Sequence, residues 1–213
     1  RLRQRKRRDA KPFAVMVRDL ATAHQHCIIS AGEEELLTSP AAPIVILQRR
    51  EDSPLPAEAI HPGLKTLGVM LPYTPLHYLL FDDELRVLIM TSANISDEPL
   101  ITVNEEALDK LGAVADFFLL HNRDIYNPGD DSVVQFTKAG TVHFMRRARG
   151  YVPEGISLGR QVQPVLALGG EMKNTFCITR GSDAFLSQHW GDLNHYQNYV
   201  SFLRGIERFK SSL

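Results

Sequence analysis

The sequence has few cysteines and no long hydrophobic run, and both shortages exclude kinds of protein. Cys27 and Cys177 are its two cysteines, so the chain has neither a disulfide framework nor a CxxC pair for zinc. No apolar run approaches the roughly 18–20 residues that a membrane span needs. No apolar core follows the charged first residues, so we expect no signal peptide there. We therefore expect a segment of a longer protein from a reducing, cytoplasmic compartment without a membrane partner.

The chain also lacks an excess of charge of either sign. It has 24 Lys and Arg residues against 25 Asp and Glu residues, which gives a net charge of −1. This balance argues against nucleic acid as a partner and against an acidic disordered tail. Hydrophobic residues make up 44% and charged residues 23% of the 213 positions, as in ordinary globular domains. The length allows one large domain or two small ones.

Short apolar segments alternate with polar ones in the manner of an α/β protein. A helix is predicted from Thr102 or Asn104 to just before Gly112, with Thr102 and Glu105 as a capping box. The proline-rich residues 51–63 are expected to form a long surface connection. Strands are predicted at residues 12–17, 43–48, 85–90, 117–120, 131–136 and 141–145.

A second structural unit is expected after about residue 164. Glycine and proline bracket the polar stretch 153–164, and the strand pattern then restarts at 165–168, 174–179 and 184–187. Roughly 50 residues are too few for an independent core, so this unit is expected to open a further domain. A closing helix is predicted to bury one stripe, formed by Tyr196, Tyr199, Val200, Leu203, Ile206 and Phe209.

Two polar clusters near strands are candidates for binding phosphate. The run Lys6-Arg7-Arg8 precedes a buried strand, and fixed cations of this kind suit phosphate oxygens. A solvated surface or a nucleic-acid patch is the alternative. Thr91-Ser92-Ala93-Asn94 directly follows an apolar strand, where ligands of α/β proteins bind. An ordinary turn with Asn94 as a helix cap is the alternative there.

A third cluster combines acidic and basic residues. Asp130-Asp131-Ser132 could hold Mg²⁺ through paired carboxylates, or could pair with nearby arginines. The run Arg146-Arg147-Ala148-Arg149 suits an anion, or a solvated edge strand. His189 and His195 are six positions apart, which is not the spacing of a helical metal pair. We expect no protein metal site from the histidines.

Taken in order, these segments resemble the hydrogenase maturation carbamoyltransferases of the HypF family. The later segments 167–177 and 185–193 are similar to the opening of the Kae1-like domain of that family. The resemblance covers essentially the whole chain, and this C-terminal part makes it specific. The segments similar to the family's YrdC-like domain are residues 6–16, 71–77, 91–94, 130–134 and 146–153.

The resemblance implies both a fold and an activity. Residues 1–155 would form a YrdC-like twisted mixed sheet with helices, 156–164 a linker, and 165–213 the first β-hairpin and helix of an actin-like, Kae1-like domain. In the family, carbamoyl phosphate is hydrolysed to carbamate, and ATP with Mg²⁺ converts carbamate to carbamoyl-adenylate. The carbamoyl group then passes to the C-terminal cysteine of the partner HypE, for the cyanide ligands of [NiFe]-hydrogenase. Zinc is expected only in an N-terminal region outside this chain.

The resemblance also implies roles for individual residues. Lys6 and Arg8 would be catalytic, because fixed cations stabilise the charge that builds on the α-phosphate and the departing pyrophosphate. Gly129 stands where relatives carry a cysteine, so no cysteine role transfers. We expect the segment to be incomplete for catalysis, because other parts of the family architecture lie outside it. The residues that match the family's nucleotide- and carbamoyl-adenylate-binding positions are Lys6, Arg8, Ser92, Asn94, Ser132 and Arg146.

Two other functions stay open at this point. One is the synthesis of threonylcarbamoyl-adenylate for tRNA modification, as in the related YrdC/Sua5 family. The other is a non-catalytic RNA-binding module that uses the basic residues 1–8. The Kae1-like start beyond residue 164 favours the HypF interpretation over the first. Salt-sensitive RNA binding that is lost on neutralising residues 1–8 would favour the second.

Overall fold

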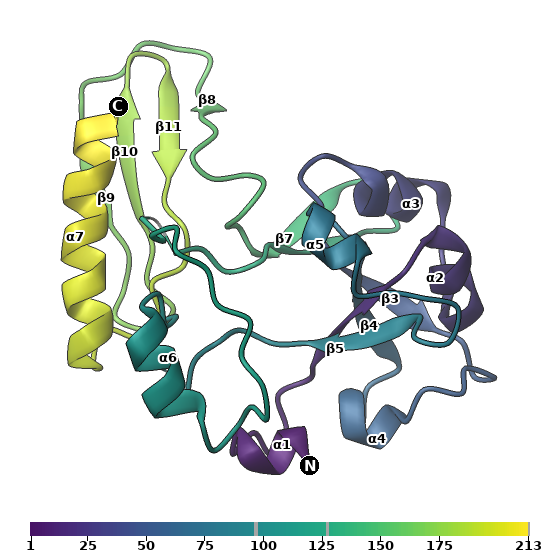
Figure 1. The fold of residues 1–213 in the computed structure, drawn as a ribbon. Coiled ribbons are helices and arrows are strands. Elements are labelled where there is room, and N and C mark those ends of the chain that lie inside the picture. Colours follow the sequence, from purple (N-terminus) through teal and green to yellow (C-terminus); the bar gives the residue numbers. More distant parts are fainter. Residues whose placement is uncertain (96–97, 127, 213) are drawn as a thin grey trace. The chain divides into compact units, whose positions relative to one another are not determined.

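The computed structural model describes residues 1–95, 98–126 and 128–212. The chain forms two compact units, and Figure 1 labels most of their elements. The sheet unit consists of Arg8–Thr91 and Asp131–Arg146. The hairpin unit consists of Arg1–Arg7, Ser92–Asp130 and Arg147–Leu213. The chain therefore passes from one unit to the other at four peptide bonds.

The sheet unit is built on a seven-stranded mixed sheet, as the sequence predicts for the first domain. Its strands are β1 (Ala14–Val17), β2 (Cys27–Ile28), β3 (Ile44–Arg49), β4 (Thr66–Met70), β5 (Val87–Met90), β6 (Val133–Phe136) and β7 (Val142–Arg146). The order is β5-β1-β4-β3-β6-β7, and β2 pairs with β3. The pairs β1–β4 and β3–β6 are parallel, and the others are antiparallel. The apolar residues of β1, β3 and β4 form the core of this unit.

Four helices belong to the sheet unit: α2 (Leu20–His26), α3 (Ala31–Thr38), α4 (Ala57–Ile60) and α5 (Pro75–Tyr78). Helix α2 begins where the Asp19 carboxylate accepts the Thr22 backbone N–H at 2.7 Å. Helix α3 begins with a capping box, in which the Glu33 carboxylate accepts the Ser30 backbone N–H. These caps satisfy backbone N–H groups that have no partner inside a helix. Local polar side chains therefore fix where these helices start.

The sheet unit differs from the sequence prediction at strands β2 and β4 and in residues 51–63. Strand β4 was not predicted, because Gly68 interrupts its apolar residues. A Cβ on Gly68 would lie 3.0 Å from the Ile44 side chain, so a small residue suits the close approach of β3 and β4. Residues 51–63 were expected to lie on the surface, which is wrong for part of them. Ile60 and His61 are buried, because α4 turns them toward the core.

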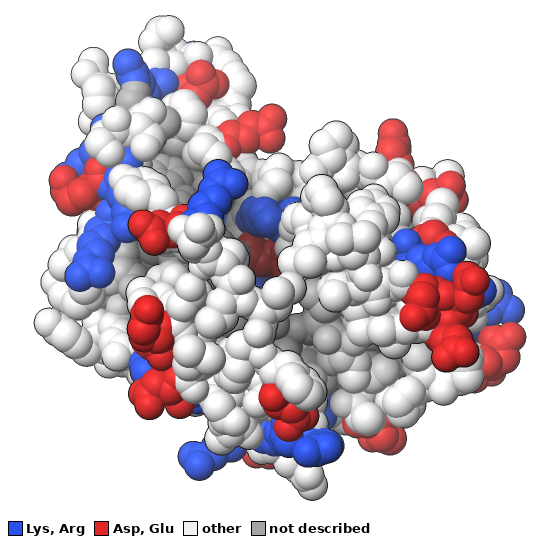
Figure 2. Space-filling view, in the orientation of Figure 1, with Lys and Arg blue, Asp and Glu red and all other residues white. Residues whose placement is uncertain are grey.

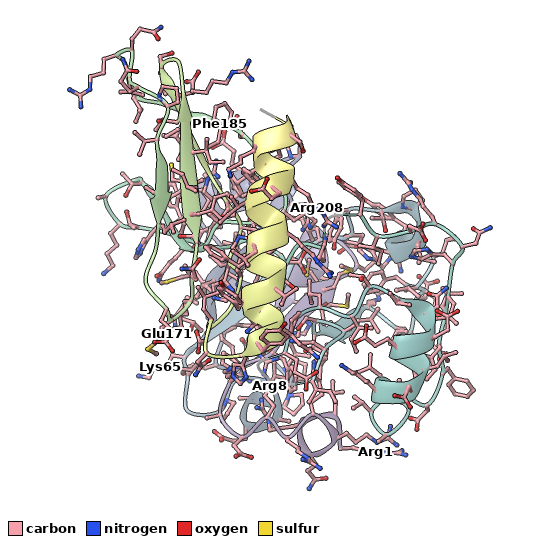
Figure 3. The ribbon with its side chains drawn as sticks, turned by 90° about the vertical axis from the view of Figure 1, so that its left-hand side faces the viewer. Arg1, Arg8, Lys65, Glu171, Phe185 and Arg208 are labelled. Carbon is pink, nitrogen blue, oxygen red and sulfur yellow. The ribbon has the colours of Figure 1, made fainter. Side chains whose placement is uncertain are left out.

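In its described residues, the hairpin unit contains a four-stranded antiparallel sheet and three helices. The strands are β8 (Ile156–Ser157), β9 (Leu166–Leu168), β10 (Phe176–Arg180) and β11 (Asp183–Leu186), in the order β8-β11-β10-β9. The helices are α1 (Leu2–Arg5), α6 (Asn104–Leu111) and α7 (Tyr196–Ser212). Helix α7 runs alongside β10 (Figures 1 and 3). No helix in the described part of the chain combines the length and apolar character that crossing a lipid bilayer requires.

The buried face of α7 is only partly the predicted stripe. Ile206 and Phe209 are buried as predicted, but Tyr196 is 77% exposed. The buried face turns instead toward Gly205, because the Trp190 ring packs against that glycine. A pattern based on apolar residues cannot register a glycine as a packing position. The core of this unit consists of Phe176, Trp190, Phe202, Ile206 and Phe209.

Two predictions for residues 102–120 are corrected by the structure. Helix α6 is present, but its N-cap is Val103 without a side-chain hydrogen bond, so the capping box of Thr102 and Glu105 is not formed. Residues 117–120 form no strand. Phe117 is 93% exposed, and a short apolar run becomes a strand only when another strand pairs with it. The sequence supplies the apolar run but not the pairing partner.

Acidification should weaken the sheet unit through His26. Its ring is buried, with Nδ1 3.0 Å from the Ser53 hydroxyl. Burial and then the charge of Arg49 lower the pKa of His26 below its ordinary value of 6.5. The unfolded chain therefore binds more protons below that pH, and the free energy of unfolding should fall as the pH drops from 6.5 through the lowered pKa. Urea denaturation followed by circular dichroism at several pH values would measure this slope. The slope of the free energy of unfolding against pH should be shallower in His26→Gln. An identical slope would contradict the assignment of this pH dependence to His26.

Candidate functional site

The polar motifs identified in the sequence lie at the four passages between the two units. These passages fall between residues 7 and 8, 91 and 92, 130 and 131, and 146 and 147. Each motif therefore contributes residues to both units. The six predicted site residues divide evenly: Lys6, Ser92 and Asn94 in the hairpin unit, and Arg8, Ser132 and Arg146 in the sheet unit.

In the hairpin unit, Lys6, Ser92 and Asn94 form one hydrogen-bonded network. The Lys6 side chain is only 6% exposed, and its Nζ donates to the Ser92 carbonyl oxygen at 2.6 Å and to Asn94 Oδ1 at 3.4 Å. Ser92 Oγ also donates to Asn94 Oδ1 at 2.7 Å, and Asn94 Nδ2 donates to the Glu98 carbonyl oxygen. An ammonium group is tolerated in a buried position only among such acceptors. The structure thus brings together residues separated by more than 80 positions in the sequence.

Local backbone geometry places the lysine in this network. Lys6 is the C-cap of α1, and Arg7 follows with a φ of 49°, a left-handed conformation that ends the helix. Helix α1 is anchored by Arg5, whose guanidinium donates to the Val114 carbonyl oxygen at 2.9 Å and to Asp116 at 2.8 Å. The cation at the C-terminal end of α1 also complements the partial negative charge there.

In the sheet unit, Arg8 is held next to the end of β5. Its guanidinium donates to the carbonyl oxygens of Lys11 at 3.1 Å and Pro12 at 2.6 Å, and to Thr91 Oγ1 at 3.3 Å. The guanidinium also lies over the Phe13 ring, 4.7 Å from the ring centre. Arg8 is labelled among the side chains of Figure 3. These contacts orient the side chain beside the end of β5.

The Asp131-Ser132 segment contacts a tyrosine to which sequence reasoning gave no role. The Tyr73 hydroxyl donates to Asp131 Oδ1 at 3.3 Å, and the His77 ring lies edge-on to Tyr73 with ring centres 4.5 Å apart. Ser132 is fully buried, and its carbonyl oxygen accepts the Ile44 backbone N–H. Tyr73 belongs to the segment 71–77 that carries part of the family resemblance. This family resemblance of segment 71–77 is the sequence signal that could have pointed to Tyr73.

Arg146 and Arg147 lie on opposite sides of one passage. Arg146 ends β7, where it pairs with Val133 of β6 next to a register shift. Arg147 donates to the carbonyl oxygens of Leu186 at 3.4 Å and Glu154 at 2.9 Å, and burial lowers the pKa of its guanidinium. Arg147 therefore has a structural role within the hairpin unit.

The cysteines and carboxylates limit the chemistry that protein groups can supply. Burial raises the pKa of the Cys27 thiol to about 12 and also raises that of Cys177. Neither thiol is therefore poised as a nucleophile at neutral pH. Across the described ranges, no three His, Cys, Asp or Glu side chains gather into a group that could hold a metal ion. A magnesium ion bound to a nucleotide needs only one or two carboxylates, because phosphate oxygens and water complete its shell.

Each unit by itself presents a cation suited to an anionic ligand, Lys6 in the hairpin unit and Arg8 in the sheet unit. Lys6 and Arg8 carry fixed positive charge, and their side chains are already oriented by carbonyl, amide and hydroxyl oxygens. Such preorganised donors stabilise negative charge that develops on phosphate groups. On the face shown in Figure 2, basic and acidic side chains are interspersed, unlike the continuous basic surface of a general nucleic-acid binder.

Two family models match consecutive parts of the chain. Residues 1–148 match the Sua5/YciO/YrdC family, which is described as "Telomere recombination". Residues 160–213 match the HypF Kae1-like domain. Carbamoyltransferase HypF2 of Cupriavidus necator is 51% identical over the whole chain, which covers 28% of that relative. Carbamoyltransferase HypF of Rhizobium leguminosarum bv. viciae is 47% identical over 91% of the chain, which covers 26% of that relative.

Solved structures of HypF also match nearly the whole chain. Full-length HypF in a phosphate- and nucleotide-bound form is 49% identical, with a TM-score of 0.91 over 98% of this chain and 33% of that one. HypF from T. kodakarensis is 40% identical, with a TM-score of 0.92 over 98% of this chain and 27% of that one. P. abyssi Sua5 is 19% identical with a TM-score of 0.57 over 69% of this chain and 45% of that one, a likeness of fold alone. The chain thus spans about a quarter to a third of the length of its HypF relatives.

Proposed function

Because the chain belongs to the HypF family, as a YrdC-like domain joined to the start of a Kae1-like domain, we propose that it makes carbamoyl-adenylate. The named relatives support a carbamoyltransferase role. In the proposal the chain works in the cytoplasm as part of a longer enzyme, called the full-length enzyme below. That enzyme obtains carbamate from carbamoyl phosphate and passes the carbamoyl group to a HypE-type acceptor protein.

The proposed chemistry has two steps. A carbamate oxygen attacks the α-phosphorus of ATP, the bond from the α-phosphorus to the bridging oxygen breaks, and pyrophosphate leaves with the electron pair. The acceptor's cysteine thiolate then attacks the carbamoyl carbon, and AMP leaves. Neither step needs a covalent intermediate on this chain, which agrees with the raised thiol pKa values. Mg²⁺ enters as part of the ATP substrate and neutralises phosphate charge.

The observation that carries the proposal is the buried Lys6 ammonium at the Ser92–Asn94 turn. In the proposed mechanism Lys6 and Arg8 neutralise the charge that develops on the α-phosphate and pyrophosphate. Ser92 and Asn94 orient the lysine and contact the nucleotide, while Ser132 and Arg146 complete the nucleotide contacts in the sheet unit. A HypF relative crystallised in a phosphate- and nucleotide-bound form gives independent support.

Threonylcarbamoyl-adenylate synthesis is the second candidate, because P. abyssi Sua5 complexed with L-threonine shares the fold at 20% identity. The match of residues 160–213 to the HypF Kae1-like domain favours carbamate as the acid. An RNA-binding module is disfavoured by the net charge of −1.

Substrate dependence of the full-length enzyme tests the proposal. With ATP, Mg²⁺ and the HypE-type acceptor present, carbamoyl phosphate should stimulate the release of pyrophosphate and AMP well above the rate without it. Threonine plus bicarbonate should give no stimulation. Phosphate and pyrophosphate are measured separately, so that hydrolysis of carbamoyl phosphate is not counted as adenylation. Stimulation by threonine plus bicarbonate, and not by carbamoyl phosphate, would replace the proposal with the second candidate.

A further inference from the structure

An irregular segment of the hairpin unit leads into the Asp130-Asp131-Ser132 motif. The described residues of 121–130 form neither helix nor strand, so their own backbone hydrogen bonds do not fix them. Their position depends on side chains from elsewhere in the unit. Two of these side chains, Gln188 and Arg208, come from the part that matches the Kae1-like domain.

Gln188 holds the segment from a rigid base. It is only 6% exposed, and its Nε2 donates to the Pro128 carbonyl oxygen. Its Oε1 lies 3.8 Å from the position that a Cβ on Gly129 would take. The backbone of Gln188 is fixed in turn, because its carbonyl oxygen accepts from Ser187 Oγ at 2.9 Å. Ser187 Oγ also accepts the Trp190 indole N–H at 3.1 Å, which ties this base to the aromatic core.

Arg208 holds the same segment from α7. Its guanidinium lies over the Tyr126 ring, 4.5 Å from the ring centre, and donates to the Tyr126 carbonyl oxygen. Figure 3 labels Arg208 on this helix. The neighbouring Phe209 is buried in the core, so the helix presents Arg208 from a fixed position. The backbone N–H of Arg149 donates to the Asp130 carbonyl oxygen at 3.1 Å and holds the end of the segment.

We propose that Gln188 and Arg208 are positioning residues for the adenylation site, supplied by the Kae1-like part to the YrdC-like part. They hold Tyr126, Pro128 and Gly129, and through the continuous backbone they set where the adjoining Asp130 lies. This inference rests on the proposed function, which assigns Ser132, two residues after Asp130, to the nucleotide. Small displacements of a binding group cost a disproportionate share of activity. Carbamoyl-adenylate is therefore made efficiently only when the domain that consumes it is folded in place.

The test compares Gln188→Met and Arg208→Gln with the wild-type full-length enzyme. Gln188→Met keeps the buried volume but removes the donor to Pro128, and Arg208→Gln removes the stacking group. The matched control is Arg204→Gln, one turn earlier on α7, because Arg204 is exposed. The readouts are KM for ATP and kcat in carbamoyl-phosphate-dependent ATP–pyrophosphate exchange, and hydrogen–deuterium exchange of residues 121–130.

Each positioning variant should raise KM for ATP about tenfold with a smaller change in kcat, since one hydrogen bond is worth that order in an equilibrium constant. Residues 121–130 should exchange faster while β10 and α7 keep their protection, and Arg208→Lys should recover part of the loss. An unchanged KM in an active enzyme would overturn the inference. If Gln188→Met also raises the hydrogen–deuterium exchange of β10, the result for Arg208→Gln decides whether the inference holds. If the wild-type enzyme shows no carbamoyl-phosphate-dependent ATP–pyrophosphate exchange, the proposed function is refuted instead. In that case, unchanged hydrogen–deuterium exchange of residues 121–130 in the variants would separately overturn the positioning role.

Discussion

Lys6→Ala should abolish carbamoyl-phosphate-dependent ATP–pyrophosphate exchange in the full-length enzyme. Under the proposed mechanism the Lys6 ammonium is a preorganised cation for the charge that develops on the phosphates, held by Ser92 and Asn94. Removing one preorganised electrostatic donor typically lowers kcat by on the order of 10²–10³. Lys6→Arg should not rescue the activity, because a planar guanidinium does not fit a buried site built around a compact ammonium. Arg8→Ala should lower exchange in the same direction.

The measurement is incorporation of labelled pyrophosphate into ATP, with and without carbamoyl phosphate. Lys65→Ala is the control, since this lysine is exposed and is not one of the proposed site residues. Folding is checked in the 213-residue chain by the fluorescence of Trp190, its single tryptophan, which reports on the unit that contains Lys6. Exchange at the wild-type rate in a folded Lys6→Ala enzyme would refute the catalytic assignment.

The sheet was predictable from the sequence where a strand is a short, mainly apolar run. Strands β1, β3, β5, β6 and β7 meet that condition, and their burial or pairing follows from it. Strand β4 was missed although it lies between β1 and β3, because Gly68 weakens its pattern. Residues 117–120 show the opposite error, an apolar run without a pairing strand. Local composition indicates the tendency to form a strand, but pairing between distant segments decides it.

The candidate site was predictable by residue type but not by geometry. Cations and small polar residues suggested phosphate binding, yet nothing in the spacing joins Lys6 to Asn94. The family resemblance assigns these residues to one predicted site. The structure brings Lys6, Ser92 and Asn94 into one hydrogen-bonded network. The contact between Tyr73 and Asp131, 58 positions apart, has no local sequence signal. Long-range contacts of this kind depend on topology, which periodicity does not encode.

Gly205→Ala should destabilise the hairpin unit. A Cβ at Gly205 would lie 2.1 Å from Trp190 Cζ2, far inside the distance at which a side chain must move. The indole has little room to retreat, because it stacks on Phe176, whose ring also meets Phe202 and Phe209 edge-on. Overpacking a core costs typically about 1–3 kcal/mol. Alanine gains up to about 1 kcal/mol over glycine in helix propensity, so the steric overlap outweighs the gain.

A double-mutant cycle distinguishes this overlap from a general effect on α7. Trp190→Phe removes the outer part of the indole that a Cβ at Gly205 would meet, and leaves an aromatic ring in the core. Gly205→Ala should therefore lower the free energy of unfolding by about 2 kcal/mol in the wild-type background, and by much less in Trp190→Phe. Urea denaturation of the four proteins, followed by circular dichroism, gives the coupling. Gln197→Ala, at an exposed position of the same helix, should change stability by less than about 0.5 kcal/mol. If Gly205→Ala lowers the free energy of unfolding equally in both backgrounds, the Trp190 ring does not determine which face of α7 is buried.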